Sequence, residues 1–436
     1  MNPELLRNLW LEITPQRLIA MPAVLFLVFG VVLLSDGRGA LPDAAWWTGI
    51  AVGVLWGARQ AAGAVMGEVA GRTWDSQRAS ALTPAQMGLG KLFGATAYAW
   101  YGVGLCALVH VGAGGAPAET VSLILRTGLA HGVALFASLV LLGLGGRSLV
   151  MTSLPHLAGI VAAAGAGLEA MLPVAAMMGG MAHHAAGADV GGGSIAFYGV
   201  WVDRAIFSLA TMALFWAWSV AGCIALLRGE LNVPRRLPAW PLFLGFVALY
   251  AAGLGAGPTA PVALTPAFLA LCLLTSAAAL LEPKSRRSLT RLFAGAREGL
   301  FPSLQALLAA LAAGISLIVL PSTAGWGVEG WGSLLPLAAV LFLARDIALV
   351  RLVSLRRGGL RGAVAAIVWF AVLYGMLPVV LAGAGAEAAL MLFYPLPAEG
   401  ASAATALTLG APAAQGAVLW ALLARSVRQG PSPAAP

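Results

Sequence analysis

One carboxylate lies in the middle of an apolar run, where an ionisable side chain is costly. Glu169 occurs in LAGIVAAAGAGLEAMLPV, near the centre of a segment long enough to cross a bilayer. Ionisable groups deep in lipid are usually functional, so Glu169 is a candidate intramembrane proton or cation site. A structural brace that pairs with a polar side chain on a neighbouring helix is the other interpretation, and it stays open. Arg345 and Asp346 lie toward the expected cytoplasmic end of a span, where snorkelling or local pairing would explain them.

Thioether and imidazole side chains gather directly after the Glu169 run, in residues 171–189. Both groups are ligands for soft metals such as Cu(I). The weak metal candidates are Met177, Met178, Met181, His183 and His184. Methionine is also ordinary packing material, and paired histidines in a glycine-rich loop often only face water, so we expect no metal site. The three cysteines lie in apolar segments without CxxC spacing, which indicates small core residues.

No motif for ATP hydrolysis or for another catalytic reaction occurs in the chain. The nearest approach to a Walker A loop, GLGKL at 88–92, lacks the leading glycine and has no Ser or Thr after Lys91. A nucleophile elbow and an HExxH pattern are absent too. We therefore expect that the chain is not an enzyme, has no catalytic residue and binds no cofactor itself.

The composition is that of an integral membrane protein. Hydrophobic residues make up 60% of the 436 residues and charged residues only 10%, whereas about a quarter of the residues in soluble domains are charged. The net charge of +8 does not indicate nucleic-acid binding, because the basic residues fall in the short gaps between apolar segments, where they set topology. Strand-like alternation is absent, so the spans are expected to be helices.

Apolar runs of about twenty residues predict roughly twelve transmembrane helices. The expected spans are 18–35, 45–66, 91–111, 124–145, 157–181, 204–227, 239–256, 262–281, 301–320, 332–350, 362–383 and 405–424. An even number places both termini on one side. If that side is the cytoplasm, only Arg38, Arg126 and Arg204 among the basic residues near span ends fall opposite. We therefore expect an all-α multi-pass membrane protein with cytoplasmic N and C termini.

The N-terminal segment MNPELLRNLWLEI predicts an amphipathic helix that lies in the membrane interface. Its leucine, tryptophan and isoleucine residues share one face, and its charged and amide side chains share the other. Asn2 is placed to cap this helix and Thr14 to cap the next one, each directly before a proline.

The longest polar interval of the first half is GEVAGRTWDSQRASALTPAQMGLGK, residues 67–91. It carries charges of both signs and has modest helix propensity. Thr83 is placed to cap a new helix with Pro84 at its first position. The pattern predicts a short surface helix, a corner and the next span, and the plain alternative is a solvated cytoplasmic loop.

The order, spacing and topological position of these residues together resemble ABC-2-type ABC transporter permeases. The matching residues are Glu68, Thr73, Asp75, Ser80, Leu82, Thr83, Pro84, Gly90 and Lys91. The resemblance covers residues 1–228 and implies that 67–91 is the coupling helix, which docks on a separate ATP-binding subunit that carries ATP and Mg. The docking residues that it implies are Glu68, Arg72, Thr73, Trp74, Asp75, Arg78 and Pro84.

The chain departs from the family in two respects. Trp74 stands where a smaller aliphatic residue is more usual, and about 200 residues follow where a typical member ends. We expect 229–436 to form a second six-helix domain. Its excursion EPKSRRSLTRLFAGARE, residues 282–298, has the same ordinal position as 67–91, which suggests a degenerate 6+6 repeat; an unrelated accessory bundle is the alternative. The possible second cytoplasmic contacts are Glu282, Arg286, Arg287 and Arg291.

The function that the resemblance implies is that of a membrane-spanning permease subunit in an ATP-driven exporter, in the inner (plasma) membrane of a bacterial cell. Its expected partners are the ATP-binding subunit, membrane lipid and a small or lipophilic substrate. One alternative is a 12-span ion-coupled secondary transporter in which Glu169 is the coupling carboxylate. Another is a membrane assembly factor without transport activity.

Overall fold

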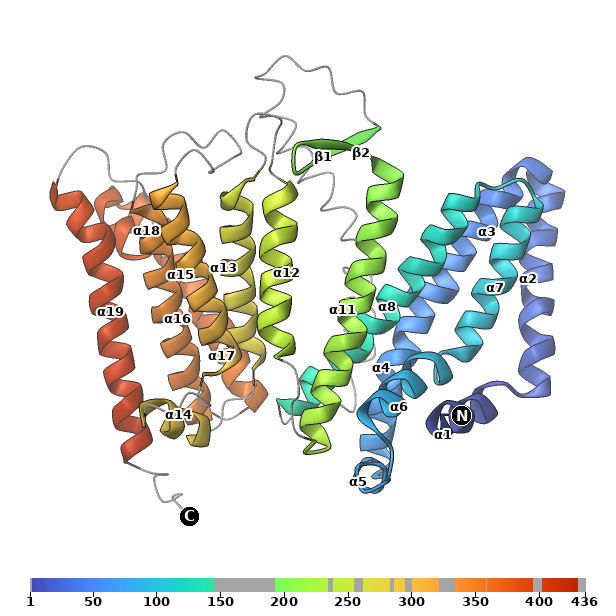
Figure 1. Ribbon diagram of the computed structural model, residues 1–436, viewed down its shortest axis with the longest axis horizontal. Helices are drawn as coiled ribbons and strands as arrows, with labels where there is room; N and C mark the ends of the chain where they lie inside the picture. Colours follow the sequence, from blue (N-terminus) through green and yellow to red (C-terminus); the bar gives the residue numbers. More distant parts are fainter. Residues whose placement is uncertain are drawn as a thin grey trace. The chain divides into compact units, whose positions relative to one another are not determined.

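The computed structural model describes residues 2–144, 193–233, 238–254, 262–282, 286–294, 300–320, 334–357, 359–394 and 402–429. Most of these residues are helical (Figure 1), and the strands among them form one two-stranded sheet. The chain divides into two compact units. Unit 1 contains residues 1–142, 146–174 and 202–239, and unit 2 contains 143–145, 175–201 and 240–436.

Unit 1 is a bundle of helices with two π-helical turns inside its spans. Its helices are α1 (Pro3–Glu12), α2 (Pro15–Ser35), α3 (Leu41–Ile50), α4 (Gly57–Ala70), α5 (Trp74–Arg78), α6 (Pro84–Leu89), α7 (Ala97–Gly112), α8 (Pro117–Gly143) and α11 (Arg204–Glu230). The π-turn η2 (Ala51–Trp56) joins α3 to α4, and η3 (Gly90–Gly94) follows α6. The helix of α6 and η3 is bent by 50° from α7.

Side-chain caps fix three helix starts of unit 1 where the sequence predicts them. Asn2 accepts hydrogen bonds from the backbone of Glu4 and Leu5, and Thr14 accepts one from Arg17. Thr83 forms a complete capping box with Gln86 at the start of α6. In each case a proline occupies the first turn, where its missing N–H removes no helical hydrogen bond.

Unit 2 contains the helices of the second half and a β-hairpin. The helices are α12 (Ala239–Leu254), α13 (Leu264–Leu281), α14 (Arg286–Phe293), α15 (Pro302–Val319), α16 (Leu335–Arg357), α17 (Gly359–Ala371), α18 (Leu377–Gly383) and α19 (Ser402–Arg428). The π-turn η7 (Val372–Met376) joins α17 to α18, and the 3-10 helix η8 is Glu387–Leu392. Helix α16 packs against α13, α15, α17 and α19 and is the central helix of this group.

The hairpin of β1 (Ser194–Phe197) and β2 (Val200–Asp203) lies in a region that the hydropathy predicts as a plain loop. Tyr198 and Gly199 both have positive φ, of 50° and 76°, which is the geometry of a tight two-residue turn. The backbone N–H of Tyr198 donates to the carbonyl of Gly253 and its hydroxyl donates to Leu249. These two bonds fasten the turn to α12.

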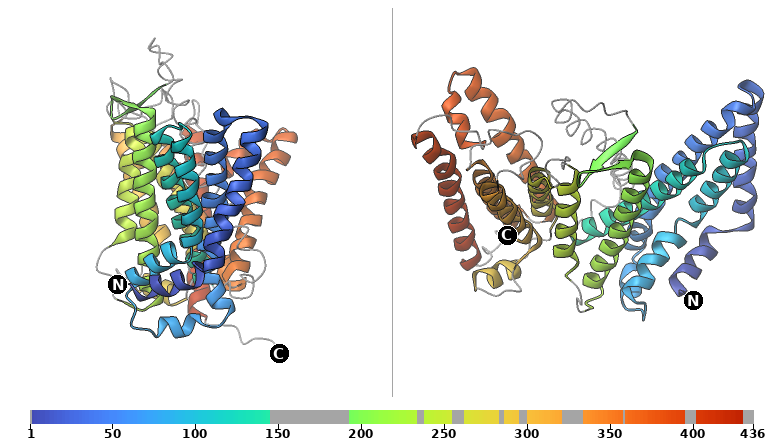
Figure 2. Two further views of the ribbon diagram at one scale, coloured as in Figure 1. Left: turned by 90° about the vertical axis from the view of Figure 1, so that its right-hand side faces the viewer. Right: turned by 45° about the horizontal axis from the view of Figure 1, so that its top comes forward.

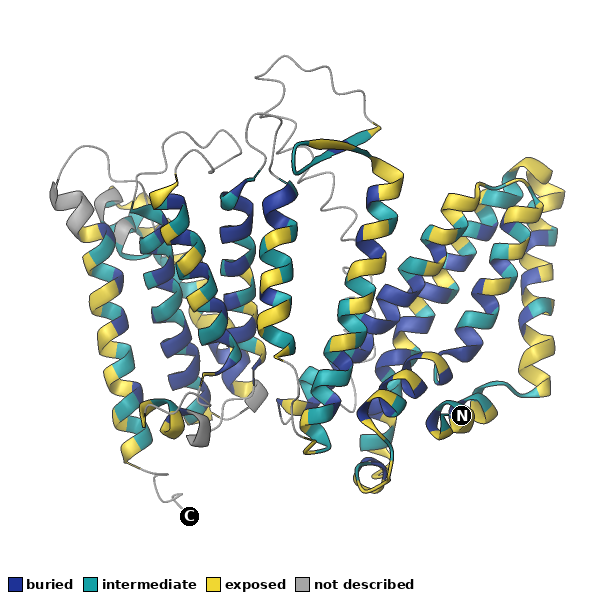
Figure 3. Ribbon diagram, viewed as in Figure 1, coloured by how far each residue is buried: buried dark blue, intermediate teal, exposed yellow. Residues whose placement is uncertain are grey.

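Figure 3 shows exposed residues along the outer sides of the helices, and large hydrophobic side chains are common among the exposed residues, as on lipid-facing surfaces. Helix α2 buries only Met21, Leu25 and Phe29 and exposes most of its other large hydrophobic side chains. A soluble protein rarely exposes so continuous an apolar face, because it would aggregate.

Seven described helices are long and apolar enough to cross a membrane, or eight if the bent pair 84–112 forms one span. The protein is therefore a multi-pass helical membrane protein. The count of twelve and the cytoplasmic termini stay predictions, because 157–181 lies outside the described residues, α12 is short and charged residues interrupt α16.

Candidate functional site

The interval 67–91 forms a compact surface feature at one end of unit 1. Helix α4 ends at Ala70, and Arg72 adopts a left-handed backbone conformation that turns the chain. Helix α5 follows, and after a corner the capped start of α6 leads into η3 and α7. The predicted short helix and corner are confirmed, and the next span stays a prediction because its helix is bent by 50° between η3 and α7. Helix α1 lies crosswise at this same end of the bundle (Figures 1 and 2).

A fully buried lysine lies beneath this surface feature. The Nζ of Lys91, in η3, donates to Glu4 Oε1 at 3.2 Å, to Gln77 Oε1 at 2.9 Å and to Glu68 Oε2. The indole ring of Trp74 lies 5.6 Å from the same Nζ. The ammonium group has three protons and three oxygen acceptors, so its hydrogen-bonding capacity is satisfied.

A second cation completes this group. Arg7 Nη2 lies 3.0 Å from Glu4 Oε1 and 2.7 Å from Glu68 Oε1. Two cations, Arg7 and Lys91, therefore face two carboxylates, and the formal charges cancel. We call Glu4, Arg7, Glu68, Gln77 and Lys91 the Lys91 cluster. It joins α1, the end of α4, α5 and the start of the next span, because each of these elements supplies at least one member.

Helix α1 packs against η3 through its polar face. A Cβ on Gly90 would lie 2.5 Å from Glu4 Cγ, and a Cβ on Gly94 would lie 2.7 Å from Asn8 Cβ, so both positions require glycine for this contact. Asn8 Nδ2 also donates to the carbonyl of Gly90 at 3.3 Å.

The apolar residues of α1 consequently point away from the protein. Trp10 is 84% exposed, and Leu6 and Leu11 are exposed as well. This orientation is that of a helix with its apolar face in the membrane interface.

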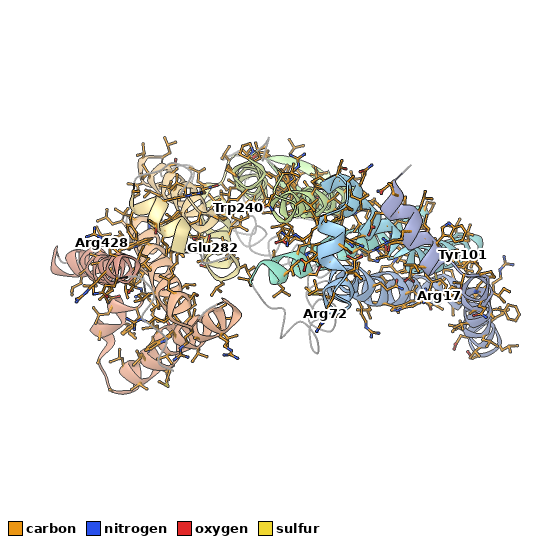
Figure 4. The ribbon with its side chains drawn as sticks, turned by 90° about the horizontal axis from the view of Figure 1, so that it is seen from below. Arg17, Arg72, Tyr101, Trp240, Glu282 and Arg428 are labelled. Atoms are coloured by element: carbon orange, nitrogen blue, oxygen red, sulfur yellow. The ribbon has the colours of Figure 1, made fainter. Side chains whose placement is uncertain are left out.

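The structure separates the docking residues that the resemblance implies. Arg72, Thr73 and Asp75 are exposed, and the Asp75 carboxylate is 74% accessible. Figure 4 shows Arg72 at the edge of unit 1. Glu68 and Arg78 are half-buried, and Arg78 Nε donates to the carbonyl of Glu230 at the end of α11.

The other two docking residues face inward. Trp74 and Pro84 are buried, and Trp74 belongs to the hydrophobic core of unit 1. They shape the loop and form no part of its outer surface, whereas Arg72, Thr73 and Asp75 do.

The possible second contact in 282–298 is also turned partly inward. Glu282, labelled in Figure 4, is buried and accepts hydrogen bonds from the Ser303 backbone N–H at 2.9 Å and hydroxyl at 2.6 Å. It also forms an ion pair with the buried Arg351 of α16. Arg291 is exposed on α14. The side chains of Arg286 and Arg287 lie outside the described residues.

Arg345 and Asp346 belong to a polar group inside unit 2 that the sequence analysis does not predict. The pair does not lie at a helix end, because α16 continues to Arg357 and places both residues at its middle. Arg345 is buried and contacts Tyr374 of η7 and Gln415 of α19. The sequence feature that could have indicated this group is that Arg345, Asp346, Tyr374 and Gln415 are polar residues within separate apolar runs.

The remaining candidates from the sequence lie outside the described residues. They are Glu169, Met177, Met178, Met181, His183 and His184. In the part of the chain that the structure describes, no three His, Cys, Asp or Glu side chains come together as a metal site would require.

No protein-family model, curated protein or solved structure matches the chain.

Proposed function

We propose that the protein is the membrane-spanning permease subunit of an ATP-driven ABC transporter of the ABC-2 type. The observation that carries the proposal is the surface feature at 67–91, which presents Arg72, Thr73 and Asp75 outward above the buried Lys91 cluster. This pairing of an accessible polar surface with a rigid support is what a docking site for a separate subunit requires.

The Lys91 cluster gives this surface a mechanical connection to two spans. Glu68 belongs to the last turn of α4, and Lys91 to the beginning of the helix that leads into α7. A force applied to α5 is therefore passed to both spans through charged contacts. An ATP-binding partner would bind ATP and Mg and catalyse the hydrolysis. The helices of this chain would change conformation and form the pathway of the substrate across the membrane.

The two units repeat the same order of parts, which supports a 6+6 arrangement of 1–228 and 229–436. In each, a glutamate lies at or near the C-terminal end of an apolar helix, a short polar helix follows, and the next long helical segment begins with a proline at its first position. The glutamate of each unit is paired with the first turns of that next segment, through Lys91 in one unit and Ser303 in the other.

The direction of transport that we propose is export across a bacterial inner membrane. Cytoplasmic placement of the 67–91 surface follows from the distribution of basic residues. The apolar composition favours a small, lipophilic or amphipathic substrate.

A charge reversal on the exposed surface tests the docking role. Tagged protein is purified from its own cells, and co-purifying subunits are identified by mass spectrometry. We expect an ATP-binding subunit with the unmodified protein and its loss with Asp75→Arg, because the substitution places a cation at the centre of the contact. Asp36→Arg is the matched control, since Asp36 is exposed at the far end of α2. Equal recovery of the subunit with Asp75→Arg would contradict the proposal.

An ion-coupled secondary transporter is the second candidate function, and the buried Arg345 and Asp346 favour it. Ionisable groups at such depth are typical of transport pathways driven by ion gradients. Uptake or export by reconstituted protein under a proton gradient, with no ATP-binding subunit present, would establish this alternative.

A further inference from the structure

The polar group at the centre of α16 is a network of five side chains, from α16, η7, α19 and the segment that follows η8. Arg345 Nε and Nη2 donate to Asp346 Oδ1 at 2.9 and 2.8 Å. Arg345 Nη1 donates to Gln415 Oε1 at 2.8 Å, and its Nη2 also lies 2.7 Å from Tyr374 Oη. The Tyr374 hydroxyl donates to Asp346 Oδ2, and the hydroxyl of Tyr394 donates to the Tyr374 carbonyl. We call these residues the Arg345 cluster.

The cluster lies deep in the helix bundle. Ten residues separate Leu335 from Arg345, which corresponds to about 15 Å of helix, and twelve more follow to Arg357. The side chains of Arg345 and Asp346 are 4% and 13% exposed. Arg345 therefore does not extend to an interface, and the Phe342 ring 4.7 Å from its guanidinium carbon adds an apolar wall.

A charged pair at this depth is not explained by stability alone. Desolvation of two ions costs several kcal/mol, and apolar side chains of similar volume often stabilise a core as well or better. Neutral side chains would join the same helices without that cost. Ionisable side chains that face the interior of a helix bundle in a membrane protein are therefore candidates for a functional group.

The cluster is electrically neutral, and among the side chains that the structure describes the neighbouring charges are paired or distant. Glu282, directly after α13, pairs with Arg351 of α16. Arg361 lies thirteen residues before Tyr374, and Arg425 ten residues after Gln415, which are about 20 and 15 Å of helix. Helices α15 and α18 contain no charged residue. Addition of one ion alone would leave an uncompensated charge, whereas addition of a proton together with an anion preserves neutrality.

Both helices that face Arg345 have an interrupted backbone at the cluster. Tyr374 belongs to the π-turn η7, and Gln415 follows Pro412, which lies inside α19. Turns of the π type and internal prolines occur where a helix changes its hydrogen bonding, often at functional sites. The partners of Arg345 can therefore move away from it without breaking a regular helix.

We propose that the Arg345 cluster binds a carboxylic acid, as an anion on Arg345 and a proton on Asp346. The ligand carboxylate takes the place of the Asp346 carboxylate as hydrogen-bond acceptor on Arg345. The acid form of the buffer gives up a proton and becomes its conjugate base, and this proton forms the O–H bond of Asp346. The hydroxyl of Asp346 then donates to the Tyr374 oxygen, and the Tyr374 hydroxyl, which donates to Asp346 in the resting site, turns to the ligand carboxylate. No covalent bond of the protein breaks, and the total charge of the site stays zero. This site is independent of an ATP-binding subunit.

Calorimetric titration with benzoate, a soluble weak acid with an aromatic ring, tests the proposal. The purified full chain in detergent is titrated in two buffers that differ in their enthalpy of ionisation, which reports the protons taken up. We expect one proton per benzoate bound. The affinity should rise about tenfold for each pH unit lowered while Asp346 is ionised in the free protein, because the bound state holds one more proton.

Two substitutions separate this site from a structural brace. Asp346→Asn keeps the shape but removes the competing carboxylate, so benzoate should bind about tenfold or more tightly, with no proton uptake. Arg345→Gln should abolish binding, and Arg425→Gln, at an exposed position of the same bundle, should leave it unchanged. Absence of saturable binding to the folded unmodified protein would overturn the proposal. So would binding without proton uptake, or weaker binding by Asp346→Asn.

Discussion

Lys91 is the residue on which the support of the 67–91 surface depends most. Its replacement by methionine keeps the chain length of the side chain but leaves Glu4 and Glu68 with Arg7 as their shared cation. Loss of one partner from a buried ion pair typically costs about 3–5 kcal/mol. We therefore expect Lys91→Met to lower the free energy of unfolding in detergent by this amount, measured by denaturant titration.

Arg17 provides the control for this substitution. It forms an ion pair with Glu12, and its side chain is 44% exposed. Ion pairs at exposed positions contribute about 0–1 kcal/mol, because water screens them. Arg17→Met should therefore change the unfolding free energy little. Equal effects of the two substitutions would show that the burial of Lys91 has no energetic consequence.

At the scale of elements, the contact between α1 and η3 is the most sensitive to a single added carbon. A Cβ on Gly90 would lie 2.9 Å from the backbone nitrogen of Leu5. A flexible side chain could move aside to relieve such a contact, but the backbone of a helix cannot do so without a shift of the whole helix. Gly90→Ala should therefore lift α1 from η3 and increase hydrogen–deuterium exchange in residues 3–12.

Gly63 is the matched control because it is also helical but faces open space. Gly63→Ala should leave exchange in α1 unchanged and stabilise α4 by up to about 1 kcal/mol, since alanine is the better helix former. Unchanged protection of α1 in Gly90→Ala would mean that the helix is held mainly by its charged contacts.

The elements that the sequence predicts are those whose causes are local. Thr83 caps α6 because a hydroxyl, a proline and a glutamine occur within four residues. The Lys91 cluster could not be predicted in the same way, because Lys91 and Glu4 are 87 positions apart and only packing of α1 on η3 brings them together. The central position of Arg345 in its helix was hidden for a similar reason, since hydropathy indicates where an apolar run ends, at 350, whereas the helix α16 continues to Arg357.

At the scale of the whole molecule, the repeated order of parts predicts the stoichiometry of the transporter. Unit 1 and unit 2 each carry a glutamate at or near the end of one apolar helix, a short polar helix and a proline-initiated helical segment. If both serve as membrane halves, one chain provides what two copies of a six-span permease would provide.

We therefore expect one permease chain with two ATP-binding subunits in the purified complex, measured as its intact mass in native mass spectrometry. The variant Arg291→Glu, at an exposed position of α14, should reduce this to one ATP-binding subunit, because it reverses charge on the second surface only. A complex with two permease chains would contradict the single-chain arrangement and would make the second half an accessory bundle.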